Sequence, residues 1–255
     1  MTSLLAPDEP APVRILRPDG ASDVLLAADH AGRLVPRALG TLGLDEAERS
    51  RHIAWDIGIA AVTEELAALI DATAMLQAYS RLVIDCNRAP GHPTSIPVVS
   101  ETTPIPGNEN LSDGDRAARR QAIFDPYHAA LTRLLDTRQA DGRRTIVVAM
   151  HSFTPVFKGV ARAVEVGVLY HHETPLSRLM LDLLRGEGDL VVGANEPYAI
   201  TDDSDYTVPV HGEGRGLPHV EIEIRQDLIA GPAGQSAWAR RMARLLAEAD
   251  RRLKT

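Results

Sequence analysis

A series of short, mostly apolar runs is the feature that most restricts what this chain can fold into. In chain order the runs are DVLLAADH, ATAMLQAY, RLVIDCNR, RTIVVAMHS, AVEVGVLYHH, DLVVGANEPY and HVEIEIR. All but the last lack regular polar alternation, which is typical of strands that are covered on both faces. We therefore predict a strand at each run, with a turn around Tyr79 and Ser80 between the second and the third.

Segments in which apolar residues follow helical spacing lie between these runs. They cover residues 59–70, 112–138 and 238–253. Ser112 is placed to cap the second segment, and Pro126 is expected to kink or split it. Strands that alternate with helices predict an α/β domain with a largely parallel sheet.

The chain length suits one large domain of this class. We predict a single domain over residues 1–255, of which the proline-rich residues 1–12 are flexible. The only cysteine is Cys86, so an intramolecular disulfide is excluded. Because the sequence shows neither a signal-peptide pattern nor a membrane-spanning apolar run, we expect a soluble, cytoplasmic protein.

The charge of the chain limits its partners. The formal net charge is −8 at pH 7, whereas affinity for phosphate backbones and anionic membranes depends on lysine and arginine. We therefore expect neither a nucleic-acid partner nor a membrane partner. A small anionic substrate remains compatible with this charge, since a pocket can be locally basic.

Polar residues collect where the predicted strands end. His30 follows DVLLAAD, Asn87 and Arg88 follow LVID, and His151 follows IVVAM. Ligands of open α/β sheets bind at the carboxyl ends of the strands. These side chains are therefore candidates for one site.

Two histidines and a carboxylate, with water in the fourth position, form many catalytic zinc sites. His30 and His151 supply the histidines, and Asp29, Asp56 or Glu221 can supply the carboxylate. Asp29 is disfavoured because it points away from its neighbour His30 in an extended strand. Asp56 has a second interpretation as a helix-capping residue.

The run HVEIEIR predicts a strand with two unlike faces. One face carries the apolar residues Val220, Ile222 and Ile224. The other face carries the polar residues His219, Glu221, Glu223 and Arg225. This polar face belongs either to a solvated edge strand or to a catalytic cleft. In a zinc hydrolase, Glu221 or Glu223 can take a proton from water and pass it to the leaving group.

Other catalytic classes are less well supported. No serine lies in a G-x-S-x-G motif, and no G-x-G-x-x-G motif occurs. Cys86 in VIDCNR is predicted to be a buried structural thiol. A glycosidase-type pair of Glu221 and Glu223 is possible, but it leaves the neighbouring basic residues unexplained.

Several motifs together resemble the N-formylglutamate amidohydrolase family. They are DHAGRLVPRALG, HIAWDIG, YSRLVIDCNR, IPGNENLS, HSFTP, GANEPY and LPHVEIEIRQDLI, in the order of the family, from about residue 22 to residue 245. The resemblance implies a three-layer α/β/α fold like that of zinc exopeptidases, with a mixed, mostly parallel sheet. It also implies zinc-assisted deformylation of an acidic amino acid, as in the release of formate from N-formyl-L-glutamate during histidine degradation.

The resemblance also implies roles for individual residues. His30, Asp56 and His151 would bind one Zn²⁺ per chain, and Glu223 would be the general base. The residues expected to contact or surround the substrate are Asn87, Arg88, Arg81, Arg162, Arg225, Glu221 and His219. Asn87 and Arg88 would bind the substrate carboxylate, because guanidinium groups bind carboxylates in a bidentate manner.

Two rival functions follow from the same residues. One is a zinc amidase that acts on another N-acyl amino acid or on a cell-wall peptide. The other is a non-catalytic protein that binds an anion or a metal on the same scaffold. The long loops over residues 97–114 and 197–218 are expected to be functional, because loops of this length are uncommon inside compact domains. The sequence leaves the oligomeric state unknown.

Overall fold

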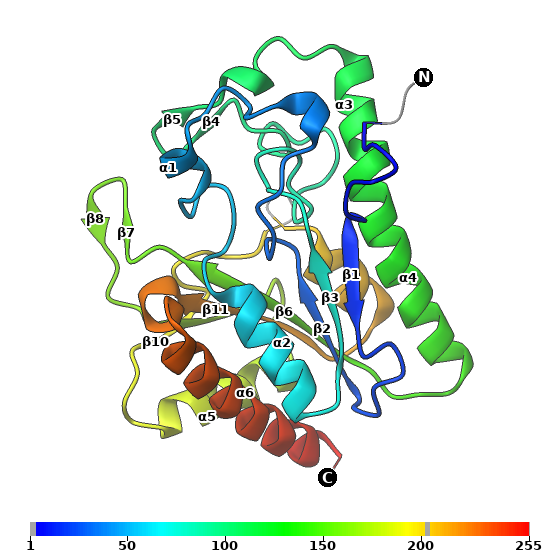
Figure 1. Ribbon diagram of the computed structural model, residues 1–255. Helices are drawn as coiled ribbons and strands as arrows, with labels where there is room; N and C mark the ends of the chain where they lie inside the picture. The colour runs from blue at the N-terminus through cyan, green and yellow to red at the C-terminus, as the bar shows by residue number, and fades with distance from the viewer. Residues whose placement is uncertain (1–3, 202–204, 255) are drawn as a thin grey trace.

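A mixed sheet forms the centre of the computed structural model, which describes residues 4–201 and 205–254. Within these residues the sheet has seven strands (Figure 1). From edge to edge they are β1 (Val13–Leu16), β3 (Thr73–Gln77), β2 (Val24–Ala28), β6 (Ile146–Phe153), β11 (His219–Arg225), β9 (Val166–Leu169) and β10 (Val192–Ala194). β3, β2, β6 and β11 run parallel, whereas β1, β9 and β10 run in the opposite direction. The predicted mixed, mostly parallel sheet is confirmed.

Helices cover both faces of this sheet and complete three layers. On one face lie α2 (Ile59–Leu69), α5 (Pro175–Gly186) and α6 (Pro232–Leu253). On the other face lies α4 (Asp125–Ala140), preceded by α3 (Asp113–Arg119). The three-layer α/β/α expectation is therefore also met.

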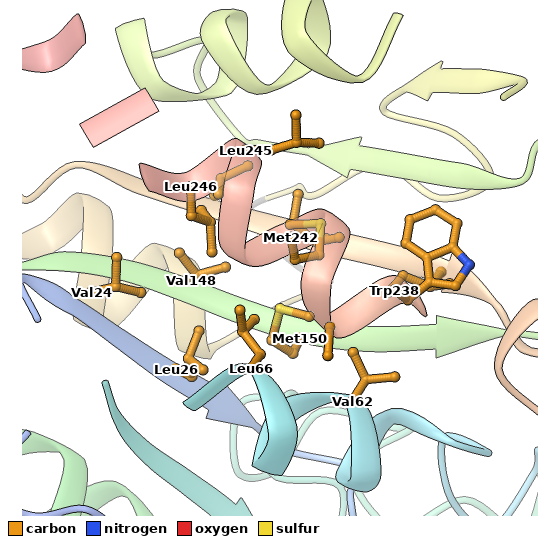
Figure 2. Packing of buried hydrophobic residues seen from close by; sticks show 14 of the residues in the cluster. Val24, Leu26, Val62, Leu66, Val148, Met150, Trp238, Met242, Leu245 and Leu246 are labelled. Carbon is orange, nitrogen blue, oxygen red and sulfur yellow. The ribbon is translucent and has the colours of Figure 1, made fainter. Parts of the chain in front are cut away.

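The first core layer packs α2 and α6 against the middle of the sheet. Figure 2 shows Met242 and Leu246 of α6 over Val148 and Met150 of β6, with Leu66 of α2 beside them. All of these side chains are at most 2% exposed. The helical stripe predicted near the C-terminus is thus a core face.

The second helical segment is split as its sequence suggests. Ser112 caps α3, and its hydroxyl accepts a hydrogen bond from the amide of Asp115 while the Asp115 carboxylate accepts one from the amide of Ser112. The helix then widens into a π-helical stretch over Arg120–Phe124. Pro126 follows in the first turn of α4, where a missing N–H is tolerated.

The strand prediction for RLVIDCNR is wrong. Residues 81–88 form turns outside the sheet, because Ser80 and Asp85 satisfy nearby backbone amides that a strand would pair with a neighbour. The apolar residues of the run, Leu82, Val83 and Ile84, are nevertheless buried in the second core. An apolar run shows burial here, and burial does not require a strand.

Several short elements carry weaker sequence signals. The strand β1 and the helix α5 lie in segments for which we predicted no element. Two hairpins, β4 (Val99–Ser100) with β5 (Thr103–Pro104) and β7 (Val156–Phe157) with β8 (Val160–Ala161), project beside the sheet. The remaining elements are α1 (Glu46–Arg49), the 3-10 turns Arg37–Leu39, Pro106–Asn108, Glu213–Arg215 and Gln226–Ile229, and the π turn Val208–Gly212.

The described part of the N-terminal segment contacts the sheet region. The Tyr79 hydroxyl donates to the carbonyl of Pro10 over 2.8 Å, and the amide of Ala78 donates to the carbonyl of Pro12 over 3.0 Å. Residues 1–3 lie outside the described residues. Among residues 4–201 and 205–254, no helix combines the length and the apolar character needed to cross a membrane.

A single glycine governs how α2 begins. Gly58 has φ +84°, and a Cβ at this position would lie 2.2 Å from the carbonyl oxygen of Ile229. We expect Gly58→Ala to lower the free energy of unfolding by about 3 kcal/mol or more, since it adds overpacking to left-handed strain. Gly142 is the matched control, because it has φ +65° with no neighbour within 4 Å.

Gly142→Ala should cost only about 1–2 kcal/mol, the strain contribution alone. Urea unfolding of both variants and the wild type measures the two costs. Equal losses of stability in the two variants would contradict the close contact between Gly58 and Ile229.

Candidate active site

A cavity of about 430 Å³ opens at the carboxyl ends of the parallel strands. His30 follows β2, His151 lies on β6, and Glu221 and Glu223 lie on β11; all four line the cavity. Both long loops contribute as well, with Glu101 from residues 97–114 and with Tyr198, Ala199 and Asp205 from residues 197–218. The two loops that we expect to be functional therefore both border this cavity.

The pairing of β6 with β11 sets the positions of the charged side chains. Glu223 is the register partner of His151, and Glu221 is the partner of Ala149. Register partners on parallel strands point to the same face, so Glu223 lies beside His151. Val220, Ile222 and Ile224 enter the core on the other face. The predicted division of HVEIEIR into two faces is confirmed, and the polar face is buried.

His30, Asp56 and His151 form a compact buried cluster. The Nδ1 atoms of the two histidines are 3.2 Å apart. One Asp56 oxygen lies 3.1 Å from Nδ1 of His151, and the other lies 3.6 Å from Nδ1 of His30. Each side chain is at most 3% exposed. Three side chains of the types that bind metals therefore converge on one point.

The opposite nitrogens of both histidines face carboxylates. Nε2 of His30 is 2.7 Å from the carboxylate of Asp85, and Nε2 of His151 is 3.5 Å from that of Asp29. Thr207 in turn donates to Asp29 over 3.0 Å. A carboxylate behind an imidazole fixes the orientation of the ring and its protonated nitrogen. In both rings this leaves Nδ1 directed into the cluster.

The side chain of Asp56 does not cap α2. The N-cap of that helix is Gly58, and no side chain caps it. Instead, one Asp56 oxygen accepts a hydrogen bond of 3.0 Å from the amide of Ser152. The amide of Asp56 also donates to the carbonyl of His30 over 2.9 Å, which ties the two residues together. Of the two interpretations of Asp56, the geometry favours the one in the cluster.

Burial and neighbouring charges act in opposite directions on the aspartates. Burial would raise the pKa of Asp56, but His30 and His151 hold that pKa well below its ordinary value. Burial likewise opposes ionisation of Asp85, and Arg81 and His30 keep its pKa low. Both aspartates are thus anions at neutral pH, as metal ligands and their supporting groups must be.

The two glutamates behave differently from the aspartates. Burial raises the pKa of Glu221 and of Glu223 to about 8, against the partial compensation by His151. Their environments also differ from each other. Glu221 approaches Nε2 of His151, at 3.8 Å, which is the nitrogen turned away from the cluster. The pKa of Glu223 is affected by the charges of His151, Asp56 and Arg81, and ligand atoms of His151, Glu221 and Glu223 lie within 4.8 Å of one another.

The arginines and the asparagine expected to bind substrate already have partners. Arg81 donates through Nε and Nη2 to one oxygen of Asp85, over 3.1 and 2.7 Å. Arg88 and Asn87 both donate to Asp205, over 3.1 and 2.8 Å. All three of these expected substrate-binding residues line the cavity.

Three other expected substrate contacts lie outside the cavity lining. Arg162 stacks on the rings of Phe157 and Tyr198, which line the cavity, and donates to the Tyr198 hydroxyl over 2.8 Å. Arg225 turns outward, because its guanidinium is held by Asp227, by Glu165 and by the carbonyls of residues 162–164. Nδ1 of His219 donates to the carbonyl of Leu217 over 2.7 Å.

The structure therefore does not bring Arg225 and His219 to the site. His219 stands at the first residue of β11, two register positions before Glu221, and this places it below the cavity. Arg225 is the last residue of the strand. The chain turns outward there, and the side chain pairs with Glu165 and Asp227.

Comparison with known proteins identifies the family. The model of FGase, N-formylglutamate amidohydrolase, matches residues 22–230. The chain belongs to the N-formylglutamate amidohydrolase family. No curated protein matches it.

Two solved structures resemble this member of the family. A gene product from Agrobacterium tumefaciens is 39% identical, with a TM-score of 0.96, and the match covers 99% of this chain and 100% of that one. N-formylglutamate amidohydrolase from Ralstonia eutropha is 21% identical, with a TM-score of 0.71, and the match covers 94% of this chain and 98% of that one. The second likeness concerns the fold alone.

The donor set in this amidohydrolase-family site fits a divalent metal. His30, Asp56 and His151 offer ligand atoms within 4.8 Å of one another. Among the described residues, buried oxygens of Glu221 and Glu223 have no hydrogen-bond partner. Two imidazole nitrogens that face each other beside several carboxylates leave an excess of acceptors, which a cation would satisfy. Nitrogen and carboxylate ligands of this kind suit zinc.

Several residues of the site could not be recognised as such from the sequence. Asp85 lies in a segment that we predicted as a strand, Asp205 looks like an ordinary loop aspartate, and Tyr198 looks like a surface aromatic residue. The one available signal was position, since Asp85 lies next to the Asn87–Arg88 motif and the other two lie in a long loop. Cys86 is buried as predicted, and Gln77 donates to its sulfur over 3.1 Å. Burial raises the pKa of this thiol well above its ordinary value, so it is not a nucleophile.

Removal of the carboxylate behind His30 should weaken metal binding. We expect Asp85→Asn to lower zinc affinity about 10- to 100-fold, because the imidazole loses its orienting acceptor. Zinc titration against a chromophoric chelator measures this affinity. Asp136→Asn, which removes a carboxylate from an exposed ion pair with Arg215, is the control and should bind zinc like the wild type. Unchanged affinity in Asp85→Asn would contradict this role of Asp85.

The glutamates predict a pH dependence of stability in metal-free protein. Their pKa is about 8 in the folded state and near the ordinary value of 4.5 in the unfolded chain. Between these values the unfolded chain releases protons that the folded protein keeps, so stability falls as the pH rises. Glu223→Gln should therefore lose less stability than the wild type from pH 5 to pH 8 in urea unfolding with chelator. Parallel pH profiles would contradict the raised pKa.

Proposed function

We propose that this protein catalyses the zinc-dependent hydrolysis of the N-formyl, or a closely related N-acyl, amide of an acidic amino acid. With N-formyl-L-glutamate the products are formate and L-glutamate. The observation that carries the proposal is the buried His30–Asp56–His151 cluster with Glu223 beside it, in a cavity of a member of the N-formylglutamate amidohydrolase family.

His30, Asp56 and His151 would hold the metal, one ion per chain, with Asp85 and Asp29 orienting the two imidazoles. A zinc ion in such a site supplies a Lewis acid that lowers the pKa of a water molecule and polarises the acyl carbonyl. The protein supplies the fixed arrangement around it. All five side chains are nearly fully buried, which keeps their mutual electrostatic interactions strong.

Glu223 is the general base of the proposed reaction. It takes a proton from the attacking water and then delivers that proton to the nitrogen of the departing amino acid. Without a metal, burial raises the pKa of this carboxyl to about 8. A cation bound beside it would lower that pKa toward neutral pH, where a carboxyl can accept a proton and release it again. Glu221 is the second candidate for this role. However, Glu221 lies 3.8 Å from Nε2 of His151, and this nitrogen faces away from the cluster.

The other side of the cavity would bind the amino acid part of the substrate. Arg88, with Asn87, would bind a carboxylate at the cavity wall, and Arg81 adds positive charge near Glu223. Arg162 would act through the hydroxyl of Tyr198, to which it donates. The cavity, of about 430 Å³, suits a small N-acyl amino acid.

Metal content and turnover test the proposal together. Protein purified without a tag or chelator should contain about one zinc per chain by plasma mass spectrometry. It should release formate from N-formyl-L-glutamate, lose activity with chelator and regain it with added zinc. Bound zinc without turnover of any N-acyl amino acid or cell-wall peptide would support the non-catalytic alternative. Failure to bind zinc even when the metal is supplied would refute the mechanism.

The two glutamates of β11 can be separated by matched substitutions. Glu223→Gln should retain zinc and lose kcat by about two to four orders of magnitude, because the proton acceptor is lost while the shape is kept. Glu221→Gln should retain much more of the activity. Steady-state kinetics on zinc-loaded samples measures both variants. If Glu221→Gln is the inactive one, the base is assigned to the wrong member of the pair.

A further inference from the structure

The Asn87–Arg88 pair at the cavity wall already holds a carboxylate of the protein itself. One oxygen of Asp205 accepts hydrogen bonds from Nδ2 of Asn87 at 2.8 Å and from Nη1 of Arg88 at 3.1 Å. The side chains of Asp205 and Arg88 are only 12% and 23% exposed. Asp205 therefore occupies the groups that would otherwise bind a carboxylate of the substrate.

Further hydrogen bonds between Asn87 and the residues that follow Asp205 hold this contact in place. The side-chain oxygen of Asn87 accepts hydrogen bonds from the amides of Tyr206 and Thr207, at 2.9 and 3.0 Å. Thr207 is fully buried and donates to Asp29, which lies behind His151. The backbone that follows Asp205 is thus fixed to the floor of the site. Its carboxylate is held on Arg88 by the surrounding structure.

The rest of the cavity offers little positive charge for a second carboxylate. Among the described residues that line it, Asp85, Glu101 and Asp205 accompany the two arginines, in addition to Asp56 of the cluster and the two glutamates of β11, whose pKa burial raises to about 8. The other arginine, Arg81, is engaged with Asp85 through two nitrogens. A dianionic substrate therefore meets cationic groups that are already neutralised, and it adds a like charge beside Asp205. Like charges placed close together are one way in which sites reject a ligand.

We propose that Asp205 is a specificity-determining residue, which competes with the side-chain carboxylate of the substrate for Asn87 and Arg88. This inference rests on the proposed function, whose range of substrates it widens to neutral side chains. Because of Asp205, the site accepts N-formyl amino acids with a neutral side chain about as well as those with an acidic one. N-formyl-L-glutamine and N-formyl-L-glutamate form the matched pair of probes, since they share size and shape and differ by one charge.

The test is the ratio of kcat/KM for the two probes, measured with zinc-loaded protein. In the wild type the two values should lie within about tenfold of each other. Asp205→Asn keeps an acceptor for Asn87 and Arg88 but removes the charge. It should shift the ratio at least about tenfold toward N-formyl-L-glutamate, mainly through a lower KM, since a tenfold change corresponds to the loss of one modest charge repulsion. Arg88→Ala in the Asp205→Asn background should abolish the gain.

Control variants separate this effect from a general change in charge or folding. Glu213→Gln removes a carboxylate from the same loop, where it contacts His171 and His172 away from the cavity, and should leave the ratio unchanged. Asp205→Glu should retain the wild-type ratio, because it keeps the charge. If Asp205→Asn is poorly folded by circular dichroism, Asp205→Ser is the second removal of the charge.

Calorimetric binding of L-glutamate and L-glutamine to zinc-loaded protein provides a readout that needs no turnover. Tighter binding of L-glutamate by Asp205→Asn than by the wild type, with L-glutamine unchanged, would support the inference even if no N-formyl substrate were hydrolysed. Turnover with an unchanged ratio in Asp205→Asn and Asp205→Ser would overturn it and leave the proposed function intact. A wild type that prefers N-formyl-L-glutamate by more than a hundredfold would overturn it as well.

Discussion

The parallel pairing of β6 with β11 is the interaction on which the active site depends. Its register places Glu223 beside His151, and one face of β11 then carries ionisable groups while the other carries core residues. Taking charged groups out of water costs several kcal/mol per ion unless each finds a partner. Much of the surrounding structure can be understood as the set of partners that this edge of the sheet requires.

These partners come from segments that are distant in sequence. Asp56 precedes α2, Asp85 lies in the turn after β3, and Thr207 lies in the loop before β11. Each contributes a polar group to a histidine or to an aspartate behind a histidine. The loops are thus as necessary to the site as the strands, although the strands define where the site is. This division explains why a buried segment such as residues 81–88 leaves the sheet: a strand would use the backbone amides that now hold Asp85.

The sequence predicts the part of the site that the sheet determines. His30, His151 and the pair Glu221 and Glu223 were recognisable because strand ends and period-two alternation are local patterns, and the structure brings these residues together. The apolar face of α6 and the Ser112 cap are local patterns of the same kind, whereas the mixed sheet and the choice of Glu223 came from the family resemblance. Burial alone proved a weaker guide, since the apolar run around Ile84 is buried without being a strand.

Contacts between distant loops could not be predicted in the same way. Nothing near Asp205 in the sequence indicates that it meets Arg88, which lies 117 residues earlier. The same holds for Asp85 behind His30 and for the outward turn of Arg225. The family resemblance assigned Arg88 and Arg225 as substrate contacts because of their positions in motifs. A sequence motif does not show which groups pair with a side chain in the folded protein. Charge balance in the folded state therefore has to be read from the structure.

This difference bears on how chemistry and specificity are distributed in such a fold. Residues whose positions follow from strand register can change little without loss of the cluster, because a shift by one residue moves each side chain to the opposite face. Asp205 and Tyr198 lie in a loop, where backbone position is set by a few hydrogen bonds and substitutions are tolerated more readily. In the proposed function, the hydrolytic residues belong mainly to the sheet, and the residue proposed to set the charge of the accepted substrate belongs to a loop. Membership of a family that is named after one substrate is therefore a better guide to the hydrolytic residues than to the charge of the substrate.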